Sequence, residues 1–152
     1  MGRQIVKSLA MLALLLTLTL AANATTANGQ DQRTLKANVP FDFVVGDRTL
    51  PAGRYAVSAI GVGRETLAIQ GTNHSAARLT DVIRSRQNKS AGLVFHRYGN
   101  TYFLSHVWPA GDKAGWRLLK SRQQRAIERE LSRIAANRTS QFEEVVVIAS
   151  AR

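Results

Sequence analysis

The sequence of 152 residues contains no cysteine. A chain without thiols cannot form a disulfide bond or a thiolate metal site. It also cannot use a cysteine nucleophile or carry a lipid on a cysteine side chain. Packing and hydrogen bonding must therefore hold this chain together.

Signatures of the common enzyme classes are also missing. The chain has no Gly-x-Ser-x-Gly elbow and no His-Glu-x-x-His pair, and Gly61-Val62-Gly63 lacks the third glycine and the following helix of a phosphate-binding loop. Glu143 and Glu144 are adjacent in an expected strand, so they point to opposite faces and cannot cooperate as acid and base. We therefore expect a protein that is not an enzyme and needs no cofactor, with an enzyme of unrecognised type as a remaining alternative.

Long hydrophobic runs are confined to the N-terminus. Arg3 and Lys7 precede an apolar run over Leu9 to Leu20, and the small residues of Ala22-Asn23-Ala24 follow it. The run is roughly 12 residues long, short of the roughly 20 that span a bilayer. This is the pattern of a secretory signal peptide cleaved after Ala24. We expect an exported protein, either periplasmic or extracellular.

We expect the chain to divide into a signal peptide, a disordered lead-in and a single domain, over residues 1–24, 25–33 and 34–152.

Acidic residues are scarce. Ten Asp and Glu face 21 Lys and Arg, so the formal net charge is +11, or about +9 once the signal peptide is removed. For an exported protein, such an excess favours anionic partners such as an envelope component or an acidic protein. Nucleic acid is less expected, because no known nucleic-acid-binding motif is present. The sequence leaves the oligomeric state open.

The densest aromatic stretch is Leu93 to Trp108, LVFHRYGNTYFLSHVW. Two runs of strand-forming residues meet at Gly99-Asn100, which predicts a β-hairpin with a two-residue loop. This register pairs Tyr98 with Thr101, Phe95 with Leu104 and Leu93 with His106. It places His96 and His106 on opposite faces, and His74 lies in a turn, so we expect no metal site. Both hairpin faces are largely apolar, as in strands that are covered on both sides.

Alternating apolar residues predict further strands around this hairpin. They cover residues 35–45, 55–59, 67–69 and 77–83, with a polar loop over 84–90 and a glycine-rich loop over 109–115. Pro40 places the first strand at an edge or a bend. Val145 to Ile148 predicts a last strand that is fully buried.

The period then changes to that of a helix. Ser121 and Gln124 form a capping box, which predicts a helix over residues 122–137. Its expected apolar stripe consists of Ile127, Leu131, Ile134 and Ala135. The whole pattern predicts an all-β domain of about seven mostly antiparallel strands, in a sandwich or an open barrel, with one C-terminal amphipathic helix.

Four arginines lie opposite that stripe, within an arc of roughly 80°. They are Arg122, Arg125, Arg129 and Arg133. Guanidinium groups in such a row can bind carboxylates or phosphates through paired hydrogen bonds. The simpler interpretation is an ordinary solvated face, partly neutralised by Glu128 and Glu130 at its flanks.

Three blocks of the sequence carry a resemblance. They are VPFDFVVGDRTLPAGRYAV (residues 39–57), the hairpin LVFHRYGNTYFLSHVW and LLKSRQQRAIERELS (residues 118–132). In this order the chain resembles a group of small exported bacterial β-rich proteins of unknown function, which share PFDF-VG-LPAG-Y, LVFHRYG-YFL-W and KSRxERE blocks. The resemblance implies export and a mostly β domain, and it assigns no catalytic or binding residue.

A second candidate site is an aromatic rim beside the glycine-rich loop. Its members are Tyr98, Tyr102, Trp108 and Trp116. Such a rim suits a small ligand or a glycan, although aromatic residues in this position more often serve core and rim packing.

The sequence thus favours an exported, non-enzymatic binding or structural module of the cell envelope, whose basic helix face meets an anionic partner. The alternative is a carrier of a small ligand, with an apolar pocket lined by residues such as Phe43, Tyr55, Phe95 and Leu104.

Overall fold

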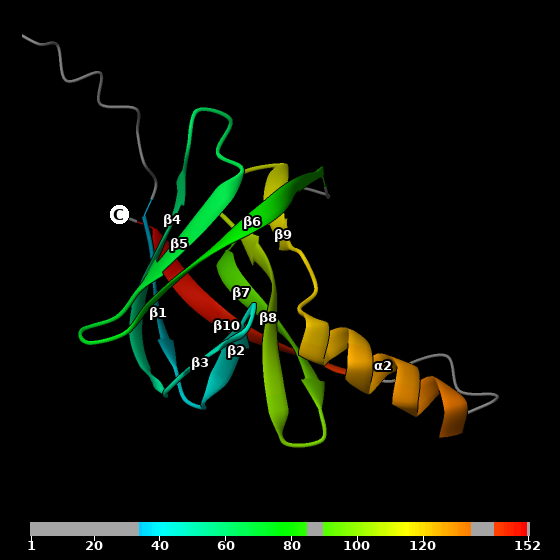
Figure 1. Ribbon diagram of the computed structural model, residues 1–152. Helices are drawn as coiled ribbons and strands as arrows, with labels where there is room; N and C mark the ends of the chain where they lie inside the picture. Colours follow the sequence, from blue (N-terminus) through cyan, green and yellow to red (C-terminus); the bar gives the residue numbers. More distant parts are fainter. Residues whose placement is uncertain (1–33, 85–89, 135–141, 152) are drawn as a thin grey trace, which may run out of the picture. The chain divides into compact units, whose positions relative to one another are not determined.

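The computed structural model describes residues 34–84, 90–134 and 142–151. Within these ranges the chain is mostly β, with a single helix near the C-terminus, so the predicted fold class is confirmed. The strands are β1 (Leu35–Val39), β2 (Phe43–Val45), β3 (Arg48–Leu50), β4 (Gly53–Ile60), β5 (Thr66–Gln70), β6 (Ser75–Arg84), β7 (Ala91–Tyr98), β8 (Thr101–Trp108), β9 (Ala114–Leu118) and β10 (Glu143–Ala151). The helix α2 covers Arg122–Ile134 (Figure 1).

The sheet closes into a barrel, which decides between the two predicted architectures. Its strand order is β3-β2-β8-β7-β10-β1-β4-β5-β6-β9, and β9 pairs with β8 as well as with β6. The β2–β3 hairpin lies outside this ring and joins it through a short parallel pairing of β2 with β8. Every other pairing is antiparallel.

Alternate residues of each strand fill the interior of the barrel. Phe43 is fully buried in this core, with its ring centroid 5.1 Å from that of Tyr55 and 5.4 Å from that of Phe95, both in edge-to-face geometry. Buried aliphatic side chains complete this core, among them Leu35, Val39, Val57, Leu67, Ile69, Leu93, Leu104 and Val107. Burial of this apolar surface is the main stabilising term for a chain without disulfides.

The first predicted strand is two strands. β1 ends at Val39, because Pro40 cannot donate to the ladder, and β2 begins at Phe43. In between, the Asp42 carboxylate accepts a hydrogen bond of 2.8 Å from the backbone N–H of Ala52. Pro40 therefore marks a bend rather than an edge, and β1 pairs with β10 on one side and β4 on the other.

The β7–β8 hairpin has the predicted two-residue loop, and Gly99 adopts the positive φ of 59° that such loops favour. Near the loop the register is as predicted, with Tyr98 opposite Thr101 and Phe95 opposite Leu104. Beyond it a β-bulge shifts the pairing by one residue, so that Leu93 lies opposite Val107 and not opposite His106.

Two strands were missing from the sequence-based prediction. β3 is three residues long and lies where turns were expected, and β9 begins inside the expected glycine-rich loop. β9 carries too few alternating apolar residues to stand out, yet it closes the barrel. Its Gly115 is required by close packing, because a Cβ atom there would lie 2.3 Å from Cε3 of Trp108.

The last strand is not fully buried, contrary to the prediction. β10 lies in the barrel wall between β7 and β1, so that its residues alternate between the interior and solvent. Val145 and Val147 pack on the core, whereas Val146 and Ile148 are 60% and 75% exposed. A run of consecutive β-branched residues cannot by itself distinguish a strand covered on both faces from one covered on a single face.

Candidate functional site

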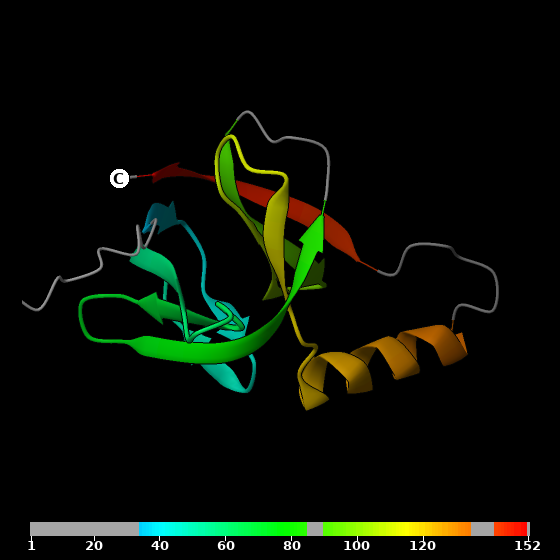
Figure 2. The ribbon, with the colours of Figure 1, turned by 90° about the horizontal axis from the view of Figure 1, so that it is seen from above.

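The helix α2 is attached to the barrel through its first turns and then extends away from it (Figures 1 and 2). The backbone N–H of Gln124 donates to Oγ of Ser121 over 3.0 Å, which confirms the predicted N-cap. Ile127 and Leu131 pack against the outer face of β7 and β8, in a cluster with Val44, Tyr98, Phe103 and Phe142. Ile134, the last residue of the helix, is 76% exposed and does not continue this stripe, and residues 135–137 lie outside the described ranges.

A group of polar side chains fixes the docked end of the helix. The Tyr98 hydroxyl donates to Oε1 of Glu128, and it accepts from Nε2 of Gln124 over 3.4 Å. Lys120 Nζ lies 2.8 Å from the other carboxylate oxygen of Glu128. The predicted capping box is therefore only half formed. Ser121 caps the backbone N–H of Gln124, but the Gln124 side chain donates to Tyr98 of the barrel and does not bond back to Ser121.

This environment changes the acidity of two groups. Burial raises the pKa of Tyr98 to about 12; the Gln124 hydrogen bond opposes this rise, and the hydrogen bond to Glu128 and the charge of that carboxylate add to it. Burial alone would raise the pKa of Glu128, but the hydrogen bonds from Lys120 and Tyr98 outweigh it and lower that pKa. Glu128 is thus held as an anion by groups on the docked side of the helix.

The four predicted arginines all lie on the exposed side of α2. Arg122, Arg125, Arg129 and Arg133 have exposed side chains, and none of them makes an ion pair within the described part of the chain. Glu128, expected to neutralise their flank, is instead engaged by Lys120 and Tyr98. Among the residues described, α2 lacks the length and the apolar character needed to cross a bilayer.

The predicted aromatic rim does not form one surface. Tyr98 is buried under α2 on the outside of the barrel, whereas Tyr102 packs towards the inside and stacks on Phe41 at a centroid distance of 3.9 Å. Trp108 and Trp116 lie towards the other end of β8 and on β9, where Trp116 Nε1 donates to the backbone carbonyl of Arg64 over 3.1 Å. The four rings are separated because successive residues alternate in direction and the hairpin spans the barrel wall.

His96 and His106 lie on the same face, contrary to the prediction. The bulge in β8 places His106 opposite Val94, and the two imidazole centroids are 5.6 Å apart. His96 is 7% exposed and stacks on Phe142, and neither of its ring nitrogens has a hydrogen-bond partner among the described residues. No group of three or more potential metal ligands occurs in the described ranges.

Burial lowers the pKa of both histidines. For His96, the neighbouring His106 and Lys120 lower it further, while the Glu144 carboxylate, 3.6 Å from Nε2, and that of Glu128 oppose the shift. Both rings are therefore kept neutral to lower pH than a free histidine.

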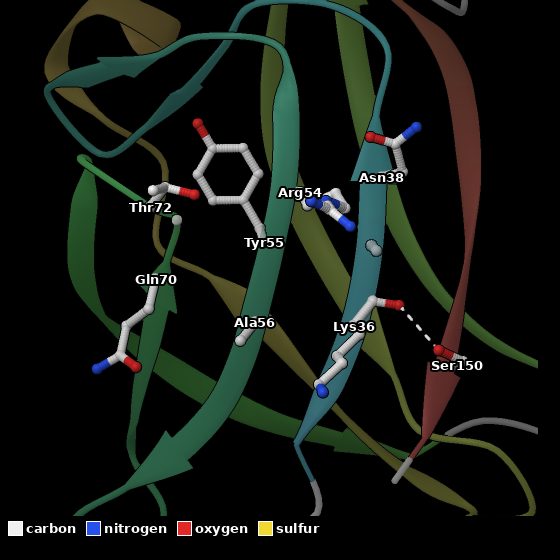
Figure 3. Close-up of a pocket in the computed structure, with 10 residues that line it drawn as sticks. Lys36, Asn38, Arg54, Tyr55, Ala56, Gln70, Thr72 and Ser150 are labelled. Atoms are coloured by element: carbon white, nitrogen blue, oxygen red, sulfur yellow. Dashed lines mark hydrogen bonds between the residues drawn. The ribbon is translucent and has the colours of Figure 1, made fainter.

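A groove on another wall of the barrel was not anticipated from the sequence. It has a volume of about 640 Å³ and lies over β1, β4 and β5 (Figure 3). Its lining consists of Lys36, Ala37, Asn38, Arg54, Tyr55, Ala56, Gln70, Gly71, Thr72 and Ser150. The lining contains two cationic side chains and no carboxylate. Only knowledge of the strand pairing brings these residues together, so sequence spacing gave no signal for the groove.

The four residues named for a carrier pocket belong to the packed core. Phe43, Tyr55, Phe95 and Leu104 are all buried in one cluster, in which the first three make direct ring contacts. The groove described above lies on the outside of the barrel instead.

Comparisons with known proteins found no match to the chain, whether among family models, curated proteins or solved structures.

Proposed function

We propose that the protein is an exported, non-enzymatic binding module of the cell envelope, in which the arginine face of α2 (Arg122, Arg125, Arg129 and Arg133) binds an anionic partner. Export rests on the signal-peptide pattern that ends at Ala24. The non-enzymatic role rests on the absence of known catalytic motifs from the sequence.

The observation that carries the proposal is a row of four exposed arginines without ion pairs among the described residues, on a helix whose opposite side is anchored. Burial of Ile127 and Leu131 fixes which side of α2 faces outward. Because the helix backbone is rigid, the Cα atoms of the four arginines are held along one side of α2 before a partner arrives, so that binding orders the side chains alone. An extended polyanion or an acidic surface can bind several of them at once.

The test is binding of the purified protein to poly-L-glutamate, followed by fluorescence anisotropy of labelled polymer at several salt concentrations. We expect saturable binding that weakens about tenfold or more between roughly 50 and 500 mM NaCl, because salt screens exposed charges. In the double variant Arg125→Glu/Arg129→Glu, affinity should fall by about tenfold or more, since two attractive contacts become repulsive.

A matched control carries the same change of charge elsewhere. Arg48 on β3 and Lys113 before β9 are exposed, and the variant Arg48→Glu/Lys113→Glu should bind within about twofold of the parent protein. Equal losses in both double variants would mean that net charge alone attracts the polymer. Binding that is independent of salt, or no binding at all, would also contradict the proposal.

A further inference from the structure

The groove over β1, β4 and β5 has the size of a small-ligand site. Its volume of about 640 Å³ lies within the range of roughly 300–1,000 Å³ that is usual for ligand pockets. Ala56 lies half-buried in its floor, and the register places Lys36 on one side of it and Gln70 on the other. Figure 3 shows the short side chain of Ala56 between the longer ones of Lys36 and Gln70, all of which line the groove.

The polar groups of the groove are available to a ligand. Lys36, Asn38, Arg54, Gln70 and Thr72 are exposed, and neither cation makes an ion pair within the described ranges. The Tyr55 hydroxyl is already used, because it donates to the Pro51 carbonyl over 2.6 Å.

The two cations can act on one anionic group. Arg54 lies opposite Asn38 and Lys36 lies opposite Ala56, so Lys36 and Arg54 are diagonal neighbours on the same face of the sheet. Diagonal neighbours are roughly 7–8 Å apart, a separation that long side chains span. A carboxylate between them would receive charge-assisted hydrogen bonds from the ammonium and from the guanidinium group.

The other residues of the lining indicate which chemical groups a ligand carries beside that carboxylate. Amide groups of Asn38 and Gln70 both donate and accept hydrogen bonds, and the Thr72 hydroxyl does the same. The Ser150 hydroxyl already donates to the backbone carbonyl of Lys36 over 3.4 Å (Figure 3). Such groups suit the many hydroxyls of a sugar, and the apolar part of the lining can contact the C–H groups of a sugar ring. From this set we infer that the groove binds an acidic saccharide, with the sugar carboxylate between Lys36 and Arg54.

The inference is independent of the proposed role of α2. In the order of strands around the barrel, β1, β4 and β5 are adjacent to one another, while the helix packs on β7 and β8. Variants of one surface leave the side chains of the other unchanged. Failure at either surface can therefore be told apart from failure at the other.

The test is calorimetric titration of the purified protein with trigalacturonate, a trisaccharide with three carboxylates. We expect trigalacturonate to bind saturably to one site and neutral maltotriose not to bind. Inorganic phosphate should bind about tenfold or more weakly than trigalacturonate. Each of Lys36→Gln and Arg54→Gln should weaken binding about tenfold, as expected for loss of one charge-assisted contact. The variant Arg125→Glu/Arg129→Glu should bind as the parent protein does.

A second pair of variants tests shape without changing charge. Ala56→Leu fills the floor of the groove and should abolish binding, whereas Ala77→Leu, at an exposed position of β6, should have no effect. The circular dichroism and melting temperature of all variants show whether they are folded. Absence of binding, equal binding of phosphate, or full binding by a folded Ala56→Leu variant would overturn the inference.

Discussion

The attachment of α2 gives a sharp prediction for the substitution Tyr98→Phe. The ring would stay in place, because its contacts with Phe103 and Phe142, at centroid distances of 5.8 and 5.7 Å, do not involve the hydroxyl. The hydroxyl itself donates to Glu128 and accepts from Gln124, and Tyr98 and Gln124 are 5% and 4% exposed. The substitution thus removes two hydrogen bonds from a region that water hardly reaches.

The expected loss is about 1–2 kcal/mol of the free energy of unfolding. Leaving a buried polar group without its partner costs about 1–3 kcal/mol. The lower part of that range applies, because Lys120 still neutralises the Glu128 carboxylate at 2.8 Å. Urea denaturation followed by tryptophan fluorescence measures the change, with an unchanged dependence on urea concentration as the sign of a purely energetic effect.

Tyr102→Phe is the matched control. No hydrogen bond of the Tyr102 hydroxyl occurs among the described residues, and its ring stacks on Phe41 with or without the oxygen. Its effect should be within about 0.5 kcal/mol. A loss below about 0.5 kcal/mol for Tyr98→Phe, or equal losses for the two variants, would refute the assignment of the Tyr98 hydroxyl as an anchor.

The same anchor has a pH dependence of known sign. The pKa of Tyr98 is raised to about 12 in the folded protein, so the unfolded chain loses this proton first as the pH rises. The stabilisation that the protonated Tyr98 hydroxyl gives to the folded protein is fully present below about pH 10 and is lost as the pH approaches about 12. The stability difference between the parent protein and Tyr98→Phe should shrink across this range.

Two further substitutions test features of the barrel wall. Burial lowers the pKa of His96, so the unfolded chain binds a proton at this residue first, and stability should fall as the pH drops below about 6.5. The variant His96→Phe keeps a ring beside Phe142 and should weaken this pH dependence in melting curves at about pH 5 to 7.5. An unchanged dependence would show that His96 does not cause it. Gly115→Ala should lower the free energy of unfolding by about 1–3 kcal/mol and shift the tryptophan fluorescence, because the new methyl group displaces the ring of Trp108. A variant as stable as the parent protein would contradict this packing.

Local sequence patterns predicted those parts of the fold that depend on local rules. Alternation along the chain placed the hairpin loop at Gly99 and the inward residues of β1, and a capping residue three positions before Gln124 placed the start of the helix. Such signals arise from the backbone geometry of one segment and its own side chains. They are therefore visible without knowledge of the fold.

Features that depend on pairing between segments were missed. A single bulge reversed the direction of His106, and the predicted separation of the two histidines became a contact. Closure of the barrel depends on β9, whose own pattern is weak. The groove needs Lys36 and Arg54 on one face of two paired strands, and no spacing along the chain encodes that pairing.

The arginine face was found from the sequence, because all four residues lie on one helix and their relative positions follow from its period alone. What the sequence could not supply is the fate of Glu128. The structure shows this carboxylate bound to Lys120 and Tyr98, on the docked side of the helix.

The most direct test of the proposed function is to map where a polyanion touches the protein. Backbone amide signals of the isotopically labelled protein would be followed by NMR while poly-L-glutamate is added at low salt. If the arginine face of α2 is the binding surface, the largest shifts will fall on residues 122–134, and Arg125→Glu/Arg129→Glu will need about tenfold or more polymer to reach them. Shifts spread evenly over the exposed basic residues, or concentrated on a strand of the barrel, would contradict that account.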